Sequence, residues 1–378
     1  MTARLIYADS ERSADLLYGT GFLAPDPFLF IQEASGTRHL VISVLEVDRA
    51  RRTAQVDRVH EWSEIQKRFK ERHPDADSNE IEPLIRFFLE ELGVAAVETP
   101  EEFPLGMGDR LRRLGVSLAA VEGAFWPQRA IKRPDEVAAV EEALRITGEG
   151  MAAGIALIRA ATLAPDGALR LDGEPLTSER VRGEIDATLI RQGASPDHTI
   201  VSGGVQGADP HERGSGPLFA HQSIILDVFP RVQRTGYFGD MTRTVCRGEP
   251  PERTRRAWEA VRQAQERAFG MIRAGVSGKA VHDAVTETLD QAGFPTGTDP
   301  ASGRQTGFFH GTGHGLGLEV HESPRISRRD QTLEAGHVVT VEPGVYYPDW
   351  GGVRLEDVVL VTETGCRNLT AVPKFLQV

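Results

Sequence analysis

The first 125 residues alternate short apolar runs with longer amphipathic stretches. This pattern predicts a small α/β domain over residues 1–125. The predicted strands cover residues 28–31, 39–45, 94–97 and 116–121, and the predicted helices cover residues 63–72, 80–92 and 108–114. The acidic, proline-bearing stretch at 71–82 is the best candidate for an internal loop.

A connector with two prolines, FWPQRAIKRPDE, separates this region from the rest of the chain. We place a linker at residues 126–136, where Asp135 and Glu136 supply the negative charge favoured at a helix N-terminus. Further helices are predicted over residues 137–159, 178–192, 251–273 and 277–291, although Gly148 and Gly150 weaken the first of them. Strands are predicted at 223–228, 239–245, 338–341 and 353–361. Residues 137–378 therefore read as a second α/β (α+β) domain with mainly antiparallel strands.

Composition narrows the function classes. The chain has 378 residues, of which 40% are hydrophobic and 26% charged, as in ordinary soluble globular proteins. Its formal net charge of −12 argues against nucleic-acid binding, which relies on clustered Lys and Arg. We find neither a secretory leader nor an apolar segment long enough to cross a membrane, so a cytoplasmic protein is expected. The two cysteines, Cys246 and Cys366, fit small buried residues better than a disulfide framework.

Two aspartates stand at the edges of strands that are predicted to pair. Asp227 ends the apolar run SIILDVF, where an unpaired carboxylate would carry a heavy desolvation cost. Asp240 begins DMTRTV, and strand alternation places it on one face with Thr242 and Thr244. A hairpin of the two strands brings both aspartates to a comparable height. Taken alone, each also fits a loop edge or a turn.

The segment HGTGHGLGLEVHE, residues 310–322, contains three of the 11 histidines of the chain. These are His310, His314 and His321, and glycines are interleaved among them. This glycine density excludes an ordinary helix and allows the backbone to approach a ligand closely. An isolated histidine usually has a surface or core role, whereas this clustering favours binding chemistry.

Two glutamates complete the candidate set. Glu342 follows the apolar run VVTV and precedes a Pro-Gly pair, a position that also suits a solvent-facing residue. Glu356 lies in GGVRLEDVVLV, where alternation puts it on one face with Arg354 and Val358. An exposed Arg–Glu pair is the alternative, but the apolar flanks predict a strand that is buried on both faces.

The set amounts to four carboxylates and one imidazole on or beside strands, namely Asp227, Asp240, His314, Glu342 and Glu356. So many negative oxygens cannot share a core without cations. Oxygen-rich ligation with one nitrogen suits Mn²⁺, with Zn²⁺, Co²⁺ or Fe²⁺ also compatible, and bridging carboxylates permit two ions about 3.5–4 Å apart. The expected chemistry is hydrolysis, with Arg354 orienting a carboxylate ligand.

The same segments resemble the signatures of a known family. DVFPRVQRTGYFGDMTRT, HGTGHGLGLEVHESP, VTVEPGVYY and GGVRLEDVVLVT resemble, in this order, those of the pita-bread metallopeptidases. The nearest branch is that of Xaa-Pro dipeptidase (prolidase) and Xaa-Pro aminopeptidase. The resemblance is strong over residues 134–378 and weaker over residues 1–125, which are similar to the family's creatinase-like N-terminal domain. It implies a pita-bread catalytic domain over residues 137–378 and a two-metal centre held by the five residues above.

The resemblance also implies a substrate and further roles. His211, in ADPHERGSG, matches a substrate-side histidine, and His310 and His321 match the pair that flanks the ligand His314. The implied reaction is cleavage between an N-terminal residue and a following proline, with Xaa-Pro dipeptides as the expected substrates. Glu342 is the candidate to transfer the proton. A homodimer is expected, because the family is commonly dimeric.

Several alternatives remain open. An Xaa-Pro aminopeptidase would accept longer peptides, whereas a dipeptidase must also bind the substrate's terminal carboxylate. Arg325, Arg328 and Arg329 are candidates for that role, although surface charge is their more ordinary interpretation. A methionine aminopeptidase shares the five ligands but usually lacks a leading domain and a histidine matching His310. A creatinase-like amidinohydrolase uses no metal, and a binding or chaperone module would have lost the ligands.

One departure from the family pattern concerns the loop between Asp227 and Asp240, which is slightly longer than expected. Within this loop, Tyr237 and Arg234 are the residues expected to alter substrate access near the metals.

Overall fold

The computed structural model describes residues 2–378 and separates into two compact units, divided between Arg129 and Ala130. The division lies inside the predicted linker 126–136, within a short 3₁₀ turn at Pro127–Ala130. The first long helix of the second unit already begins at Pro134, with Asp135 and Glu136 in its first turn. Among residues 2–378, no helix combines the length and apolar character that a membrane crossing requires.

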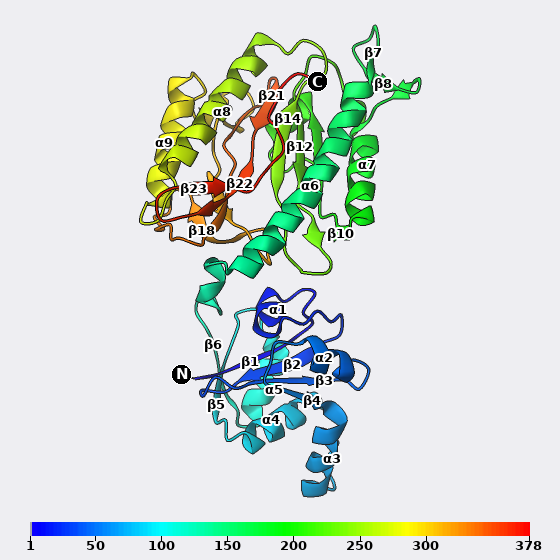
Figure 1. The fold of residues 1–378 in the computed structure, drawn as a ribbon, viewed down its shortest axis with the longest axis vertical. Coiled ribbons are helices and arrows are strands. Elements are labelled where there is room, and N and C mark those ends of the chain that lie inside the picture. The colour runs from blue at the N-terminus through cyan, green and yellow to red at the C-terminus, as the bar shows by residue number, and fades with distance from the viewer. Residues whose placement is uncertain (1) are drawn as a thin grey trace. The chain divides into compact units, whose positions relative to one another are not determined.

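The N-terminal unit is a six-stranded sheet with helices on both faces (Figure 1). Its strands are β1 (Ala3–Ala8), β2 (Phe28–Gln32), β3 (Arg38–Ile42), β4 (Arg58–Glu61), β5 (Ala96–Thr99) and β6 (Ser117–Ala120), in the order β4-β3-β2-β1-β5-β6. Its helices are α1 (Ala14–Thr20), α2 (Val47–Thr53), α3 (Trp62–Arg72), α4 (Ile81–Glu91) and α5 (Leu105–Arg113). Apolar residues of α3, α4 and α5 cover one face, and those of α1 and α2 cover the other.

The sequence analysis found most of these elements but missed β1, α1, α2 and β4. Strand β1 lacks a clear two-residue period because it is buried on both sides: Leu5 packs with the α3–α5 core and Ile6 with the α1–α2 core. The strand predicted over 39–45 ends at Ile42 instead. The chain turns there, with the Glu46 amide donating to the Ser43 carbonyl, and this turn leaves Leu45 85% exposed.

The second unit contains α6 (Pro134–Ala160), α7 (Ser178–Arg191), α8 (Glu252–Met271), α9 (Gly278–Gln291) and a 3₁₀ turn, η2 (Gly204–Ala208). Its two main sheets are β11 (Ile200–Gly203), β12 (Ile224–Val228) and β14 (Met241–Val245), and β18 (Glu322–Ile326), β17 (Gly313–Gly315), β19 (Val338–Val341), β22 (Asp357–Val361) and β23 (Cys366–Asn368), each in spatial order. Shorter pieces are the hairpin β20 (Gly344–Tyr347) and β21 (Gly351–Arg354), the sheet β7 (Thr162–Leu163), β8 (Leu169–Leu171) and β9 (Glu174–Pro175), and the pairs β10 (Ala194–Ser195) with β13 (Arg231–Val232) and β15 (Gly297–Thr298) with β16 (Gln305–Thr306).

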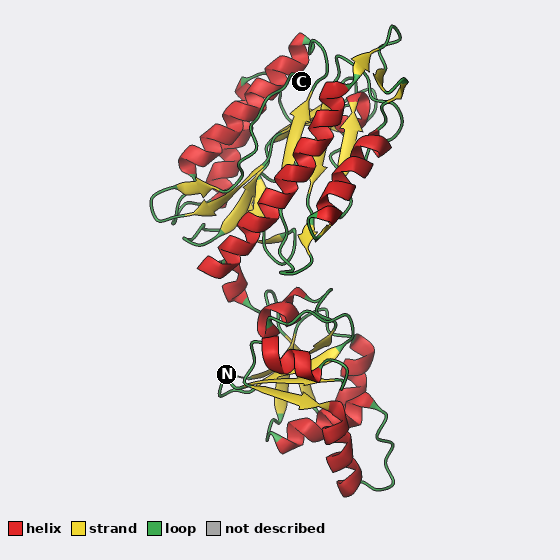
Figure 2. Cartoon of the chain, turned by 45° about the vertical axis from the view of Figure 1, so that its right-hand side comes forward, coloured by secondary structure: helices red, strands yellow, loops and turns green. Residues whose placement is uncertain are grey.

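This unit is built as two halves around its strands. Helices α6 and α7 pack against β11, β12 and β14, and helices α8 and α9 pack against β18–β21 (Figures 1 and 2). The named strands pair antiparallel, as the sequence predicts, and the four predicted helices of this unit are present. Of the two cysteines, Cys246 is buried and Cys366 is half-buried.

The strand predicted over 353–361 is in fact two strands. Strand β21 ends at Arg354 and β22 begins at Asp357, so Leu355 and Glu356 lie at a break between two sheets. The prediction that this run is buried on both faces is confirmed, since every residue from 351 to 359 is buried.

Glycines in α6 serve packing rather than weakening the helix. Helix α6 is continuous through Gly148 and Gly150. A Cβ atom at Gly154 would lie 2.7 Å from Ile185 Cδ1, and one at Gly150 would lie 2.8 Å from Leu189 Cδ2. Both contacts are shorter than carbon atoms tolerate, so these glycines allow α6 and α7 to approach closely.

We predict that Gly154→Ala lowers the free energy of unfolding by about 1–3 kcal/mol, because the added methyl group overpacks the contact between α6 and α7. The matched control is Gly183→Ala on α7, where nothing lies within 4 Å of the new Cβ atom. It should raise the free energy of unfolding by about 0.5–1 kcal/mol. Urea denaturation measures both changes, and two changes of the same sign would contradict this account.

Candidate metal centre

The two aspartates come from neighbouring antiparallel strands, as predicted. Asp227 on β12 pairs with Thr242 on β14, and Asp240 precedes β14 by one residue. Asp240 lies two positions before Thr242, so both aspartates lie on the same face of the sheet as diagonal neighbours. This pairing register brings them to a comparable height, as predicted.

His314 enters from the other half of the unit, at the middle of β17. Its flanking glycines are required by the neighbouring strands: a Cβ atom at Gly313 would lie 1.9 Å from the Thr340 carbonyl oxygen, and one at Gly315 would lie 2.3 Å from that of Ser323. We expected these glycines to let the backbone approach a ligand. At these two positions they instead let β19 and β18 pack closely on either side of the histidine.

Three of the predicted ligands converge within one small volume. Ligand atoms of Asp240, His314 and Glu356 all lie within 4.8 Å of one another, and the three residues are buried. Glu342 joins them from the end of β19, with its Oε1 atom 3.3 Å from His314 Nε2. Asp227 lies beside the group and acts electrostatically on both Asp240 and Glu356.

Burial and the mutual repulsion of the carboxylates shift the pKa values of this cluster strongly. Burial, followed by the charge of Asp227, raises the pKa of Asp240 well above its ordinary value, and burial together with Asp240 does the same to Glu356. Burial alone would lower the pKa of His314, but its hydrogen bond to Glu342 and the nearby carboxylates raise it overall. Burial would raise the pKa of Glu342, yet contact with His314 brings it down to about 2. The chain alone therefore cannot keep all of these carboxyls ionised, and a bound cation would favour their ionised forms.

The donor set fits a divalent cation. His314 Nδ1 lies 3.1 Å from the Gly315 carbonyl oxygen, to which it can only donate, so Nε2 is the ring nitrogen that would give up its proton and offer a lone pair to a bound cation. Asp227 Oδ2 accepts from Arg354 at 2.7 Å, whereas its buried Oδ1 finds no hydrogen-bond partner within residues 2–378. An imidazole lone pair and an unpartnered carboxylate oxygen are ligands that a divalent ion would satisfy.

Arg354 begins a chain of hydrogen bonds that leads to His310. Its Nη1 donates to the Tyr346 hydroxyl at 2.9 Å, so the hydroxyl proton is left for His310 Nε2, also at 2.9 Å. His310 Nδ1 then donates to the Gly311 carbonyl at 2.8 Å. This sequence of donors and acceptors fixes a neutral His310, in agreement with its pKa, which burial lowers. Arg354 thus connects Asp227 to one of the predicted substrate-side histidines.

The structure also brings the other two histidines to this place. The rings of His321 and His314 meet edge to face with their centroids 4.4 Å apart. His321 as a residue is exposed, but desolvation of its ring by neighbouring groups and the charge of His314 lower its pKa to about 4. His211 lies on an exposed loop after η2, and its charge acts on both His310 and His321.

Comparison with known proteins places this centre in a family. The model of "Metallopeptidase family M24" matches residues 138–363, more than half of the chain. The chain belongs to metallopeptidase family M24. This membership confirms the predicted pita-bread fold and its Xaa-Pro dipeptidase and aminopeptidase branch.

Relatives of known name support this assignment. The Xaa-Pro dipeptidase of Pyrococcus furiosus is 32% identical over 245 residues, which cover 64% of this chain but only 63% of the relative. That of Pyrococcus horikoshii is 28% identical over 284 residues, or 74% of each chain. Among solved structures, the X-Pro aminopeptidase of Thermotoga maritima matches with a TM-score of 0.82 at 25% identity, covering 100% of this chain and 98% of that one. The prolidase of Pyrococcus furiosus matches in fold with a TM-score of 0.78 at 24% identity, covering 99% and 97%.

In this M24 chain, further residues that were not predicted from the sequence as site residues hold the ligands in place. Thr242 donates its hydroxyl to Glu356 Oε2 at 2.9 Å and accepts from Arg354 Nε at 3.1 Å. Thr244 exchanges hydrogen bonds with the Arg354 backbone. The alternation of Asp240, Thr242 and Thr244 already pointed to the two threonines. Tyr346 carried no comparable signal beyond its even spacing from Glu342.

Two side chains of the longer loop between the aspartates bind to a helix. The Tyr237 hydroxyl donates to Glu136 Oε1 at 2.7 Å, and Arg234 pairs with Glu142 at 2.6 Å. Both partners lie on α6. The side chains of Tyr237 and Arg234 therefore fasten the loop to this helix, and their effect on substrate access stays a prediction.

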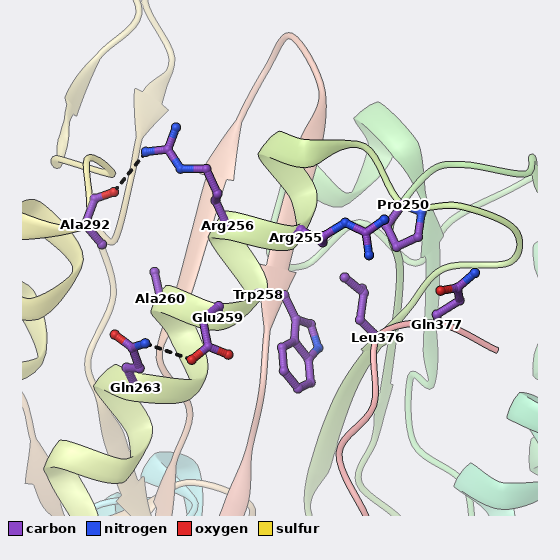
Figure 3. Close-up of a pocket in the computed structure, with 10 residues that line it drawn as sticks. All are labelled: Pro250, Arg255, Arg256, Trp258, Glu259, Ala260, Gln263, Ala292, Leu376 and Gln377. Carbon is purple, nitrogen blue, oxygen red and sulfur yellow. Dashed lines mark hydrogen bonds between the residues drawn. The ribbon is translucent and has the colours of Figure 1, made fainter.

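The groove drawn in Figure 3 is separate from this M24 centre. It runs along α8 and the C-terminal segment, between Arg255, Trp258 and Leu376. None of the five candidate ligands lines it. The chemistry is defined by the buried cluster and not by this open hollow.

A buried ion pair fixes the segment that carries His321. Lys132 Nζ lies 2.6 Å from Glu322 Oε2, and the two side chains are 1% and 6% exposed. Glu322 Oε1 also accepts from the backbone amides of Leu318 and Glu319, at 2.9 and 3.2 Å. The segment between His314 and His321 is thereby closed into a turn around one carboxylate.

We predict that Lys132→Met lowers the free energy of unfolding by about 3–5 kcal/mol, because it removes one partner of a buried ion pair. The matched control is Lys279→Met, which breaks an exposed pair with Asp283 on α9 and should change stability by less than about 0.5 kcal/mol. Chemical denaturation followed by circular dichroism measures both. Equal losses of unfolding free energy in the two variants would show that the buried ion pair contributes no more to stability than the exposed one.

Proposed function

We propose that this protein is a metal-dependent Xaa-Pro dipeptidase, which hydrolyses the bond between an N-terminal residue and a following proline. The observation that carries the proposal is the buried convergence of Asp240, His314 and Glu356 within 4.8 Å, beside the unpartnered Oδ1 of Asp227. Relatives named Xaa-Pro dipeptidase support the substrate class.

The five ligands would hold two divalent cations, with Mn²⁺ as the first choice for this oxygen-rich set. Such ions supply polarisation of the scissile carbonyl and a water that ionises near neutral pH. Glu342 is the group that takes the proton of the attacking water and passes it to the leaving nitrogen. It reaches the cluster through His314 and is less buried than Asp240, which suits a role facing the substrate.

The histidines around the cluster provide the remaining contacts. His321, whose pKa of about 4 keeps it neutral at physiological pH, donates to the carbonyl oxygen as negative charge develops there. His310 and His211 face the proline. Because the proline nitrogen carries no N–H, selection rests on the shape of the ring and not on a hydrogen bond from that nitrogen.

We predict that chelator-treated protein does not cleave Xaa-Pro dipeptides and that added Mn²⁺ restores activity. Turnover of Xaa-Ala should be at least about tenfold lower, the scale on which an apolar pocket discriminates. Glu356→Gln should lower kcat/KM by at least about 100-fold, since loss of a ligand exceeds the usual effect of an outer residue.

Glu363→Gln, an exposed carboxylate outside the cluster, is the control and should behave as wild type. Elemental analysis of the same samples separates two failures. Bound metal with equal turnover of Xaa-Pro and Xaa-Ala contradicts the specificity, whereas absence of bound metal favours a binding module.

An Xaa-Pro aminopeptidase that acts on longer peptides is the second candidate. It is favoured by the full-length structural match to the X-Pro aminopeptidase of Thermotoga maritima, at a TM-score of 0.82. The two functions differ in whether the substrate's carboxylate follows the proline directly. Arg325 is the best anchor for that group, because it pairs across the strands with His314 and its charge acts on His321.

We predict that Arg325→Met raises KM for an Xaa-Pro dipeptide by about 10–100-fold, the range for losing a hydrogen bond to a charged group, with little change in kcat. KM for Xaa-Pro-Xaa tripeptides should change far less. Arg329→Met, in the exposed turn beyond β18, is the control. Equal loss with dipeptide and tripeptide would remove Arg325 as the carboxylate anchor, and faster turnover of tripeptides by the wild type would favour the aminopeptidase.

A further inference from the structure

Arg243 is a buried cation on β14, the strand that follows Asp240. Its side chain lies on the face of β14 opposite to that of the candidate metal ligands. Arg243 lies in the middle of β14, between Thr242 and Thr244, and is 2% exposed. Strand alternation points its side chain away from the face that Asp240 and Thr242 share. A guanidinium cannot shed its charge, so a buried one needs several acceptors in fixed directions.

These acceptors are mainly backbone oxygens. Nη1 donates to the carbonyls of Thr242 at 2.9 Å and Glu356 at 2.6 Å, and Nη2 donates to Asp357 Oδ1 at 2.8 Å and the Val372 carbonyl at 2.6 Å. Nε is buried and has no hydrogen-bond partner in the described chain. A buried ion pair is weak evidence for stability by itself, because apolar residues of similar volume often serve as well. The directions of the four bonds therefore matter more than the charge.

The bonds converge on a ligand that lacks ordinary strand support. Glu356 lies at the break between β21 and β22, outside both ladders. Its amide donates to the Thr242 carbonyl at 3.0 Å, its carbonyl accepts from Arg243, and its carboxylate accepts from the Thr242 hydroxyl. The dipeptide Thr242-Arg243 thus holds Glu356 by its amide, its carbonyl and its side chain.

We propose that Arg243 is a positioning residue for the metal centre. By fixing the peptide of Glu356 at the strand break, it aims the Glu356 carboxylate at Asp240 and His314. Through Val372 it also ties the C-terminal segment to the same point. The inference rests on the proposed function, since the group being positioned is taken to be a metal ligand.

The test is metal binding by the full-length chain, measured without substrate. Metal-free wild type and Arg243→Lys are titrated with Co²⁺, followed by visible absorption and calorimetry, and the unfolding temperature of each metal-free protein is recorded. We expect Arg243→Lys to raise the Kd by about 10–100-fold, as loss of an outer-shell partner typically does, and to alter the Co²⁺ spectrum.

The matched control is Arg247→Lys. Arg247 also donates to backbone carbonyls, those of Ala161 and Val378 at 3.0 Å each, but none of its bonds reaches the cluster. It should lower the unfolding temperature while leaving the Kd within about twofold of wild type. An unchanged Kd and spectrum in Arg243→Lys, at whatever unfolding temperature, would overturn the proposal.

A second variant covers the case in which Arg243→Lys does not fold. Arg243→Gln removes the guanidinium, while Asp357 keeps a cation because Lys374 Nζ lies 2.6 Å from its Oδ2 atom, so no buried carboxylate is isolated. It should still weaken Co²⁺ binding at least about tenfold, and binding as tight as wild type would overturn the proposal. If the wild type itself binds no Co²⁺, the proposed metal-dependent function fails first, so the two failures remain distinct.

Discussion

Uncompensated negative charge is the constraint on which the centre of this protein depends. Strands from both halves of the second unit carry carboxylates into a space where they lose the hydration that water provides. Arg354 neutralises Asp227 on one oxygen, and His314 can neutralise one neighbour at most. The raised pKa values of Asp240 and Glu356 show that the chain alone disfavours the ionised form of both carboxyls. A divalent cation would favour that ionised form.

The surrounding fold holds these charges with neutral donors. Thr242 and Thr244 bind Glu356 and Arg354 through hydroxyl groups, which fix direction without adding charge. Because Gly313 has no Cβ atom, the strand that carries His314 packs directly against the backbone of β19. Because the ligands lie at strand ends and at a strand break, they approach one point from several directions. The antiparallel strands of the two halves form a rigid framework. The strand ends and the strand break direct the ligand side chains towards one another.

Part of the arrangement of the ligands could be predicted from local patterns in the sequence. The alternation around Asp240 predicted its shared face with Thr242, and the apolar flanks of Glu356 predicted burial, because both depend on immediate neighbours. The ion pair between Lys132 and Glu322 joins residues 190 positions apart, and no local pattern records such a contact. The split at Glu356 was equally hidden, since the β-rich run continues through it in the sequence while the chain passes from one sheet to another.

Some buried charges in this unit are fully paired within the chain, and others are not. The paired charges belong to the scaffold, and the incompletely paired ones belong to the site. Lys132 with Glu322, and Arg243 with Asp357, find opposite charges within the chain at 2.6 and 2.8 Å. Such pairs are complete and ask for no ligand. Asp227 is only half paired. One of its oxygens accepts a hydrogen bond from Arg354, and the other is buried without a partner in residues 2–378. Within the described residues this second oxygen is left for a ligand from outside the chain, so Asp227 belongs both to the scaffold and to the site.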